Sequence, residues 1–444
     1  MNNTVLFSQL ISSLSFFTVA NTNSEVAVTP QSLVNGDDVK KVLEADKRKE
    51  AQLISYEVID FTKRGDNYAC VVSSVKVKYD LHEKQDYVSY VVKLNPCRNF
   101  TGYEDLTAIM FKKEAKFYAD IVPELNAVLE ALNQDPLKFP KCYHYNLTMG
   151  KEQIYFEDLR SRDFRMFDRR KGMDELHTPL VLREMARLHA AAYLLQCQNP
   201  KEPLEQKFDF LKRDWLNFTD NDAISEMMRQ LLHNYLTNSI SMLKRVGGYE
   251  SAIAWVESLI PRVEEILTQG MQSKRFGTIN HGDCWNNNIL FRYDDEGKPI
   301  DVILLDLQIC RKASLACDLN YFLYTSLTGS VRQPNLKDFL STYYSSYKGV
   351  LEDAGRDMFF NEDDLMKEFR EKNTLGAFFG MMIVPIMLME PEDVPDMSGK
   401  DDSDMDNLVQ EFQDKAMDML NTNPLLKPRF LAIFDDMMET GLIP

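Results

Sequence analysis

The stretch HGDCWNNNIL occupies residues 281–290, and the stretch VILLDLQ follows at residues 302–308. In the first stretch Asp283 precedes Asn288 by five residues, in a polar segment that leads into an apolar one. In the second stretch Asp306 ends a run of apolar residues that is typical of a buried strand. Asp and Asn are common turn residues, so each residue alone is compatible with an ordinary loop. Together the two stretches predict a loop and a short hairpin that bring the three polar side chains close to one another.

These three side chains have the chemistry that phosphoryl transfer from a nucleotide requires. A carboxylate in the position of Asp283 accepts the proton of a substrate hydroxyl group. Magnesium prefers hard oxygen ligands, and the amide of Asn288 and the carboxylate of Asp306 supply two of them. We therefore predict Asp283 as a catalytic base, and Asn288 and Asp306 as ligands of Mg²⁺.

A nucleotide site also needs a cation for the phosphate groups, and Lys93 is the candidate. It lies near the end of a predicted strand, in the sequence VVKL at residues 91–94. An acidic residue on the following helix would hold the ammonium group, and Glu114 is the candidate for that role. Glu104 and Asp105 are poorer candidates, because they lie nearer the predicted start of the helix. For any single Lys or Glu, a solvent-exposed role is the alternative.

Two further segments are candidates for contacts with the nucleotide. The stretch RGDNYA, residues 64–69, lies between two predicted strands, where backbone amide groups can contact phosphate oxygens. It contains a single glycine, so an ordinary hairpin turn is the alternative. The stretch FEDL, residues 156–159, lies where the two parts of the chain join, and its backbone is placed to pair with the edge of adenine. The predicted contact residues in these segments are Gly65, Asn67, Tyr68, Ala69, Glu157 and Leu159.

The spacing of apolar residues divides the chain into a β-rich part and a helical part. Period-two alternation, as at residues 75–79, predicts an antiparallel sheet, and helical spacing follows at residues 102–132. Beyond Asp158 the pattern is mostly helical, interrupted by a β-rich island at residues 289–307. The predicted strands are residues 54–62, 69–79, 87–94, 141–147 and 153–156, and a first helix is predicted at residues 37–53.

This order of elements predicts an α+β protein with two lobes. Residues 1–35 are rich in Asn, Ser and Thr and are predicted to be a disordered tail. Residues 36–157 are predicted to form a nucleotide-binding N-lobe, and residues 158–444 a catalytic and substrate-binding C-lobe.

The composition excludes several classes of protein. Among 444 residues, 51 Lys and Arg stand against 68 Asp and Glu, which gives a formal net charge of −17. Nucleic acids and anionic membrane surfaces repel such an acidic chain, so neither is an expected partner. The seven cysteines form an odd number and include no CxxC pair, which favours reduced thiols in the cytoplasm over a disulfide framework or a structural zinc site.

Two apolar segments bear on membrane insertion. Residues 375–389 are strongly apolar, but they are short for a span of about 20 residues and suit a buried core helix. Residues 5–20 are moderately apolar, interrupted by polar residues, and lack the basic start of a signal peptide. We therefore expect a protein without a membrane partner.

Three polar residues near these motifs are expected to serve the structure rather than the reaction. His189 lies on an apolar helix and is expected to be buried and hydrogen-bonded. Asp318 is expected to cap a helix and to brace the catalytic loop. His281 is expected to hold that loop by packing and hydrogen bonding.

The stretch HGDCWNNNILF followed by LLDLQ resembles the ecdysteroid kinase-like, or CHK kinase-like, family of arthropods. The segments VVKLNP, FKKEAKFYADIVPEL, FEDLRSRDF and MARLHAAAY agree with that family, and the likeness runs from about residue 40 to residue 430. The family is related to the aminoglycoside and choline phosphotransferases. The resemblance implies a protein-kinase-like fold, with ATP and Mg²⁺ as cofactors.

Carried over residue by residue, the resemblance implies the same site as the residues themselves. Asp283 would be the catalytic base, Asn288 and Asp306 the magnesium ligands, and Lys93 with Glu114 the ion pair that holds the phosphates. The chain departs from the family in its glycine-poor phosphate loop and in a cysteine at position 70, where a small hydroxyl residue is expected.

The resemblance points to phosphorylation of a lipophilic alcohol, either an ecdysteroid or a foreign compound in detoxification. Residues 378–387, rich in Met and aromatic residues, suit a lipophilic pocket, although a core helix with a proline kink is the favoured alternative. The excess of acidic over basic residues supports a second substrate class, a cationic amino-alcohol of the choline or aminoglycoside type. A non-catalytic pseudokinase scaffold is a third hypothesis, which predicts the loss of a metal ligand or of Lys93. The oligomeric state stays open.

Overall fold

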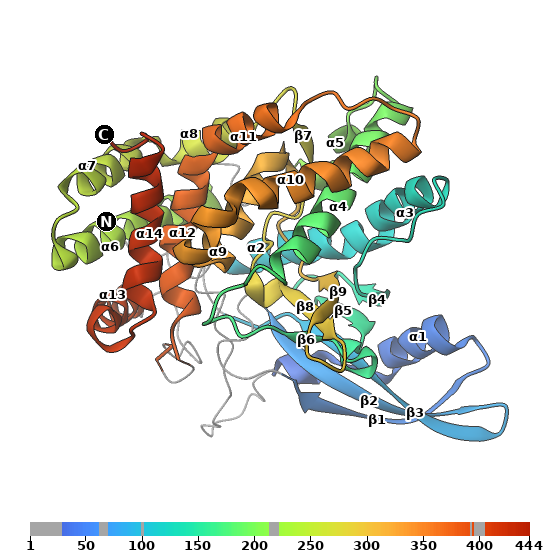
Figure 1. The fold of residues 1–444 in the computed structure, drawn as a ribbon. Coiled ribbons are helices and arrows are strands. Elements are labelled where there is room, and N and C mark those ends of the chain that lie inside the picture. The colour runs from blue at the N-terminus through green and yellow to red at the C-terminus, as the bar shows by residue number, and fades with distance from the viewer. Residues whose placement is uncertain (1–28, 62–69, 99–101, 213–221, 391–392, 395–404) are drawn as a thin grey trace.

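The computed structural model describes residues 29–61, 70–98, 102–212, 222–390, 393–394 and 405–444. It has an N-terminal lobe built on an antiparallel sheet and a larger, mostly helical C-terminal lobe, as the sequence predicts (Figure 1). Within the described part of the chain, no helix has both the length and the apolar character needed to cross a bilayer. The residue limits that the sequence suggests for the tail and the two lobes stay a prediction.

The N-terminal lobe contains a five-stranded antiparallel sheet with the strand order β1-β2-β3-β5-β4. The predicted alternation is present in β2, where Val75 and Val77 are fully buried and Lys76 is exposed. His82 and Glu83 form the turn between β2 and β3 with positive φ angles of 55° and 63°, the geometry that matches the twist of a two-residue hairpin. The strands are β1 (Gln52–Asp60), β2 (Val71–Leu81), β3 (Lys84–Leu94), β4 (Cys142–Asn146) and β5 (Gln153–Glu157).

The predicted helix at residues 102–132 is present, and it contains a change of helical type. It consists of α2 (Tyr103–Lys116), a π-helical turn (Phe117–Ile121) and α3 (Val122–Glu130). Phe111 and Ala115 lie on its buried face, as the spacing predicts. This helix carries Glu114 towards the sheet.

The first helix is shorter than predicted. Helix α1 spans Gly36–Lys47, whereas the apolar spacing predicted a helix to residue 53. Residues 47–50 are all charged, and Arg48 has a φ angle of 111°, so the chain reverses there and enters β1. A run of charged residues has no apolar face to bury, and helices in proteins are stabilised mainly by such burial.

The β-rich island of the C-terminal lobe is larger than the sequence indicated. β8 (Ile289–Tyr293) and β9 (Pro299–Leu304) form the predicted hairpin, joined by β6 (Arg165–Met166). A separate ribbon pairs β7 (Gly277–Asn280) with β10 (Arg311–Ser314). These two strands have four residues each, which is too short for alternation to reveal them.

Helices surround these strands, and the apolar segment at residues 375–389 is a core helix. Helix α12 is buried at every position from Leu375 to Met387 and packs against α6, α9 and α14. The helices of this lobe are α4 (Thr178–Gln198), α5 (Leu204–Lys207), α6 (Ala223–Val246), α7 (Glu250–Leu259), α8 (Val263–Thr268), α9 (Leu315–Ser326), α10 (Gly329–Asp353), α11 (Glu362–Glu371), α12 (Asn373–Met387), α13 (Met405–Thr422) and α14 (Leu426–Glu439).

Candidate active site

A buried lysine links the two lobes. Lys93 lies near the end of β3, and its Nζ donates to Glu114 Oε2 of α2 at 2.6 Å and to Asp306 Oδ1 of the C-terminal lobe at 2.9 Å. The lysine and Glu114 are 8% and 2% exposed, so neither charge is compensated by water. The structure therefore brings together three of the side chains that the sequence singled out.

The electrostatics of this triad follow from its burial. Burial alone would lower the pKa of Lys93, but the carboxylates of Asp306 and Glu114 outweigh it and hold that pKa well above its ordinary value. Burial raises the pKa of Glu114 to about 7, against the opposing effect of Lys93. Lys93 thus stays protonated and keeps a positive charge at the junction of the lobes.

The loop between β7 and β8 carries Asp283. Gly282 precedes it with a φ angle of +85°, and a Cβ atom at that position would lie 2.4 Å from the carbonyl oxygen of Ile309. Only glycine fits this combination of backbone angle and contact. The loop is held from α9, because the carboxylate of Asp318 accepts hydrogen bonds from the backbone N–H groups of His281 and Gly282 at 2.7 and 2.9 Å.

The expectations for the supporting residues are largely correct. His189 is fully buried, and its ring nitrogens lie 2.7 Å from the Tyr343 hydroxyl and 3.1 Å from Asp318. His281 is buried, and its Nδ1 accepts a hydrogen bond from the Asp283 N–H at 3.3 Å. The prediction that Asp318 caps a helix is wrong, since Ser314 is the N-cap of α9 and Asp318 lies inside its first turn.

Both carboxylate oxygens of Asp283 have partners. Tyr321 of α9 donates its hydroxyl hydrogen to Oδ1 at 2.6 Å, and Asn288 Nδ2 donates to Oδ2 at 3.0 Å. Burial, together with the negative charge of Asp306, raises the pKa of Asp283 to about 7. The sequence reasoning missed Tyr321, although its place one helical turn after Asp318 was a signal that could have found it.

Asp306 and Asn288 lie near each other, because the backbone N–H of Leu305 donates to the carbonyl oxygen of Asn288 at 2.8 Å. Asp306 follows β9 in the left-handed backbone region, with a φ angle of 65°, a conformation that Asp tolerates better than most residues. Its side chain is 21% exposed and remains accessible. Asn288 directs its Nδ2 to the backbone and side-chain oxygens of Asp283, while its Oδ1 accepts no hydrogen bond within the described chain.

These two oxygen donors fit a magnesium ion. Mg²⁺ keeps several water molecules and is commonly bound by one or two carboxylates together with substrate phosphates. The accessible carboxylate of Asp306 and the Asn288 Oδ1, which accepts no hydrogen bond from any described residue, meet that requirement. Among the described residues, no cluster of three or more His, Cys, Asp or Glu side chains forms a separate metal cage.

The predicted adenine contact lies where the lobes join. Glu157 ends β5, and its carboxylate accepts a hydrogen bond from the Lys141 backbone at 2.9 Å. Leu159 begins a 3₁₀ turn that Asp158 caps through the Arg160 backbone, and the Leu159 N–H finds no acceptor in the described residues. The predicted phosphate-loop residues Gly65, Asn67, Tyr68 and Ala69 lie outside the described part of the chain.

Comparisons with known proteins find one matching family model and several similar solved structures. The model of the ecdysteroid kinase-like family matches residues 64–356. Similar solved structures include an ethanolamine kinase from Plasmodium vivax, at 12% identity and a TM-score of 0.41, covering 90% of this chain and 86% of that one. A choline kinase from Cryptosporidium parvum Iowa II has 9% identity and a TM-score of 0.41, covering 92% of this chain and 98% of that one. No curated protein sequence gives a match.

The family match covers well over half of the chain and includes Lys93, Glu114, Asp283, Asn288 and Asp306. This protein belongs to the ecdysteroid kinase-like family.

Proposed function

We propose that the protein transfers the γ-phosphoryl group of ATP to a hydroxyl group of a lipophilic alcohol, of the ecdysteroid or xenobiotic class. The observation that carries this proposal is the contact of Lys93 with Glu114 and Asp306 at 2.6 and 2.9 Å. It places a fixed positive charge beside a candidate magnesium ligand at the junction of the lobes. Phosphoryl transfer depends mainly on such positioning and on electrostatic stabilisation.

Each residue of the site has a role in this proposal. Lys93, oriented by Glu114, binds the phosphate groups of the nucleotide. Asn288 and Asp306 would hold Mg²⁺, which neutralises charge on the phosphates when bound. Asp283 orients the acceptor hydroxyl and takes its proton as the new oxygen–phosphorus bond forms and the bond to ADP breaks.

The remaining nucleotide contacts are backbone contacts. The backbone of Glu157 and Leu159 would pair with the adenine edge, and the unengaged Leu159 N–H supports this assignment. The amide groups of Asn67 to Ala69, after Gly65, would contact the phosphates. A protein kinase activity is disfavoured, since the twelve residues from Asp306 to Asp318 leave little room for a peptide-binding segment.

Two other functions remain to be separated by experiment. A kinase of a cationic amino-alcohol is favoured by the net charge of −17. A pseudokinase scaffold is disfavoured by the presence of Lys93 and of both candidate metal ligands. ATP consumption therefore has to be measured with acceptors of different chemical classes.

The test is Mg²⁺-dependent phosphorylation of ecdysteroids, amino-alcohols and aminoglycosides, with the product identified by mass. Asp283→Asn is the test variant, and Asp357→Asn, at an exposed position after α10, is the matched control. We expect turnover of a steroid that is lost in Asp283→Asn and kept in the control. Turnover of an amine alone would favour the cationic substrate class. Absence of both turnover and ATP binding would refute the kinase proposal.

A further inference from the structure

Helix α9 carries two side chains that reach the loop of the candidate base. Asp318 accepts from two backbone N–H groups of that loop, and Tyr321 donates its hydroxyl hydrogen to Asp283 Oδ1 at 2.6 Å. Residues three positions apart lie on the same face of a helix, so these two contacts are about one turn from each other. One helix therefore holds both the backbone of the loop and the carboxylate that the loop carries.

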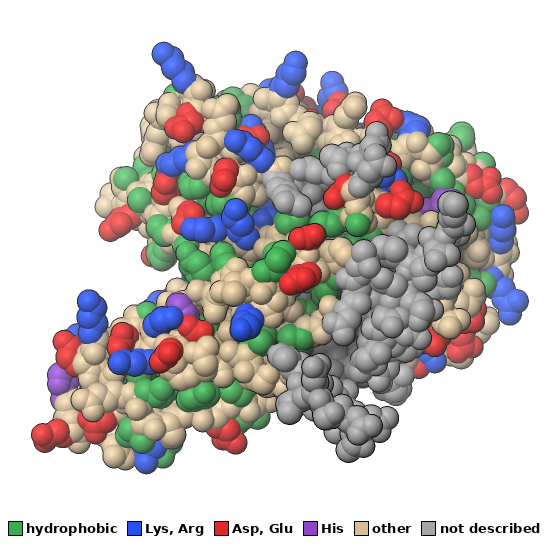
Figure 2. Space-filling view, turned by 180° about the vertical axis from the view of Figure 1, so that it is seen from behind, with side chains coloured by type: hydrophobic (Ala, Val, Ile, Leu, Met, Phe, Trp, Pro, Cys, Tyr) green, Lys and Arg blue, Asp and Glu red, His purple; other side chains and the backbone are tan. Residues whose placement is uncertain are grey.

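The hydrogen bond between Tyr321 and Asp283 lies away from bulk water. Tyr321 is 4% exposed. The 2.6 Å separation is within the range of about 2.5–2.7 Å for a hydroxyl group bound to a carboxylate. On the face shown in Figure 2, Lys and Arg side chains are interspersed with Asp and Glu, and such exposed charges are screened by water. A buried contact is not screened in this way, so it can hold a side chain in one place.

The ring of Tyr321 is itself held by the neighbouring core helix. Phe379 of α12 packs against it with ring centroids 4.7 Å apart. A Cβ atom at Gly376 of α12 would lie 2.5 Å from the Tyr324 ring and 2.7 Å from Asn320 Oδ1, both on α9. The two helices thus pack as closely as a glycine allows, which leaves the ring of Tyr321 little room to withdraw from Asp283.

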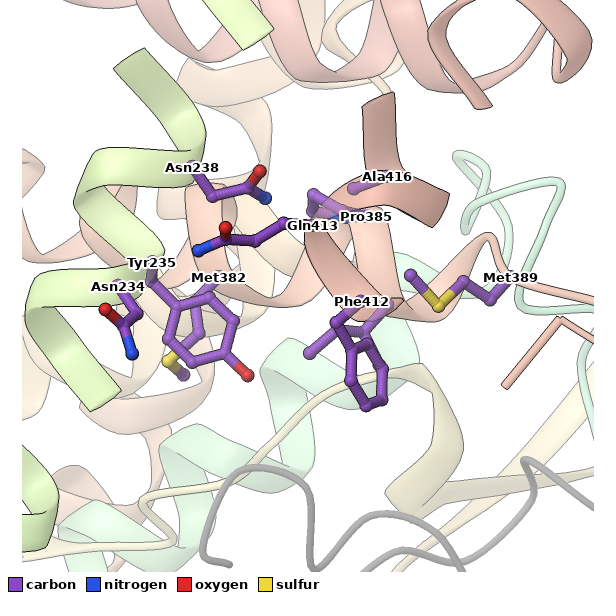
Figure 3. A pocket seen from close by; sticks show the side chains of 10 residues that line it. Asn234, Tyr235, Asn238, Met382, Pro385, Met389, Phe412, Gln413 and Ala416 are labelled. Atoms are coloured by element: carbon purple, nitrogen blue, oxygen red, sulfur yellow. The ribbon is translucent and has the colours of Figure 1, made fainter. Parts of the chain in front are cut away.

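Helix α12 is a firm support for this contact. It packs against α6 and α14 as well as α9. The space left between α6, α12 and α13 is about 30 Å³, which is enough for about one water molecule. Figure 3 shows this place, with Met382 and Pro385 of α12, Tyr235 of α6 and Phe412 of α13 around it. Helix α12 therefore has little space into which it could shift.

The carboxylate of Asp283 needs such contacts to keep one orientation. The torsion that turns the plane of an aspartate carboxylate has broad minima, so the side chain alone does not fix that plane. Tyr321 binds Oδ1 and Asn288 binds Oδ2, at 2.6 and 3.0 Å, and the two bonds together define the plane. Each carboxylate oxygen accepts more than one hydrogen bond, so an acceptor hydroxyl can still approach.

We infer that Tyr321 is a positioning residue, which fixes the plane of the Asp283 carboxylate for proton transfer from the acceptor hydroxyl. The inference rests on the proposed function and adds the residue that orients its base. The acceptor proton passes to Asp283 while the acceptor oxygen bonds to the γ-phosphorus and the bond from that phosphorus to ADP breaks. Tyr321 keeps its own proton throughout.

The first test is the variant Tyr321→Phe, which removes only the hydroxyl group. The matched control is Tyr324→Phe, three residues further along α9, whose ring is 3% exposed and packs against Arg332 instead. Turnover is measured with MgATP and with ecdysone, choline and kanamycin as acceptors. For each acceptor that the wild type phosphorylates, we expect kcat to fall at least tenfold in Tyr321→Phe, with KM for acceptor and MgATP unchanged. The control should keep both constants.

A double-mutant cycle tests whether Tyr321 acts through Asp283. In the Asp283→Ala background the carboxylate is absent, so adding Tyr321→Phe should lower kcat no further. Urea unfolding of the same four proteins measures the contact without any turnover. We expect the effects of Tyr321→Phe and Asp283→Ala on stability to be non-additive, and those of Tyr324→Phe and Asp283→Ala to add. A purely structural role would lower kcat equally in both backgrounds.

The outcomes separate this inference from the proposed function. Wild-type turnover that Tyr321→Phe leaves unchanged, or a KM that rises in place of the fall in kcat, would refute the positioning role and leave the kinase proposal standing. Additive effects on stability would refute the contact itself. Non-additive stability without turnover of any acceptor by the wild type would overturn the kinase proposal, and with it the role of Tyr321, while the contact stands.

Discussion

The carboxylate of Asp318 is the best point at which to test how the catalytic loop is held. Its Oδ2 accepts hydrogen bonds from the His281 N–H at 2.7 Å and from His189 at 3.1 Å, and its Oδ1 accepts from the Gly282 N–H at 2.9 Å. Replacement Asp318→Asn keeps the shape of the side chain but exchanges one acceptor oxygen for an NH₂ group. That group would face a backbone N–H that has no other acceptor.

The cost can be estimated from these contacts. A hydrogen bond to a charged group contributes roughly 1.5–3 kcal/mol, and a buried donor left without a partner costs about 1–3 kcal/mol. One of three bonds is lost in the best orientation of the amide, so we expect Asp318→Asn to lower the free energy of unfolding by about 3 kcal/mol. Because the loop carries Asp283, we also expect kcat to fall, while ATP binding at Lys93 is kept.

The assay is urea unfolding of the wild type, Asp318→Asn and the exposed control Asp357→Asn, followed by circular dichroism. Hydrogen bonds lower the pKa of Asp318 below its ordinary value of 3.8 and outweigh the opposing effect of burial. A depressed pKa adds stability that is present above pH 3.8 and is lost as the pH falls through the folded pKa. The difference between wild type and Asp318→Asn should therefore shrink in acid. A destabilisation below about 0.5 kcal/mol at neutral pH, with kcat retained, would contradict this reasoning.

Two further predictions concern the N-terminal lobe. Lys93→Met leaves the carboxylates of Glu114 and Asp306 facing each other without a cation. We therefore expect MgATP affinity to fall at least tenfold and the free energy of unfolding to fall by about 3–5 kcal/mol. Calorimetry that shows unchanged MgATP affinity would contradict this. Hydrogen bonds from its neighbours, Lys41 first, outweigh burial and lower the pKa of Asp38 from 3.8 to about 2. Its contribution to stability should be complete above pH 3.8 and disappear as the pH falls towards 2, and acid unfolding of Asp38→Asn should lack this dependence.

Much of the architecture could be predicted from local patterns. The alternation in β2 and the helical spacing from residue 102 to residue 132 identified both elements, because a buried face imposes its period on the sequence. The apolar segment at residues 375–389 was recognised as a core helix from its length. The strands β7 and β10 were missed because four residues do not establish a period. The end of α1 was misplaced because the reversal at Arg48 depends on backbone angles that the sequence does not display.

The sequence by itself determined the group formed by Asp283, Asn288 and Asp306, because a loop and one hairpin join these residues and leave few ways to arrange them. Only the tertiary structure decided the contact of Lys93 with Asp306 across 213 residues, and the approach of Tyr321 to Asp283. It also decided the cavity between α6, α12 and α13, to which the sequence contributed only one apolar helix. The physical reason is that sequence patterns report only on residues close to one another along the chain. Period and spacing describe neighbours along the chain, whereas these contacts depend on how helices and lobes pack in three dimensions.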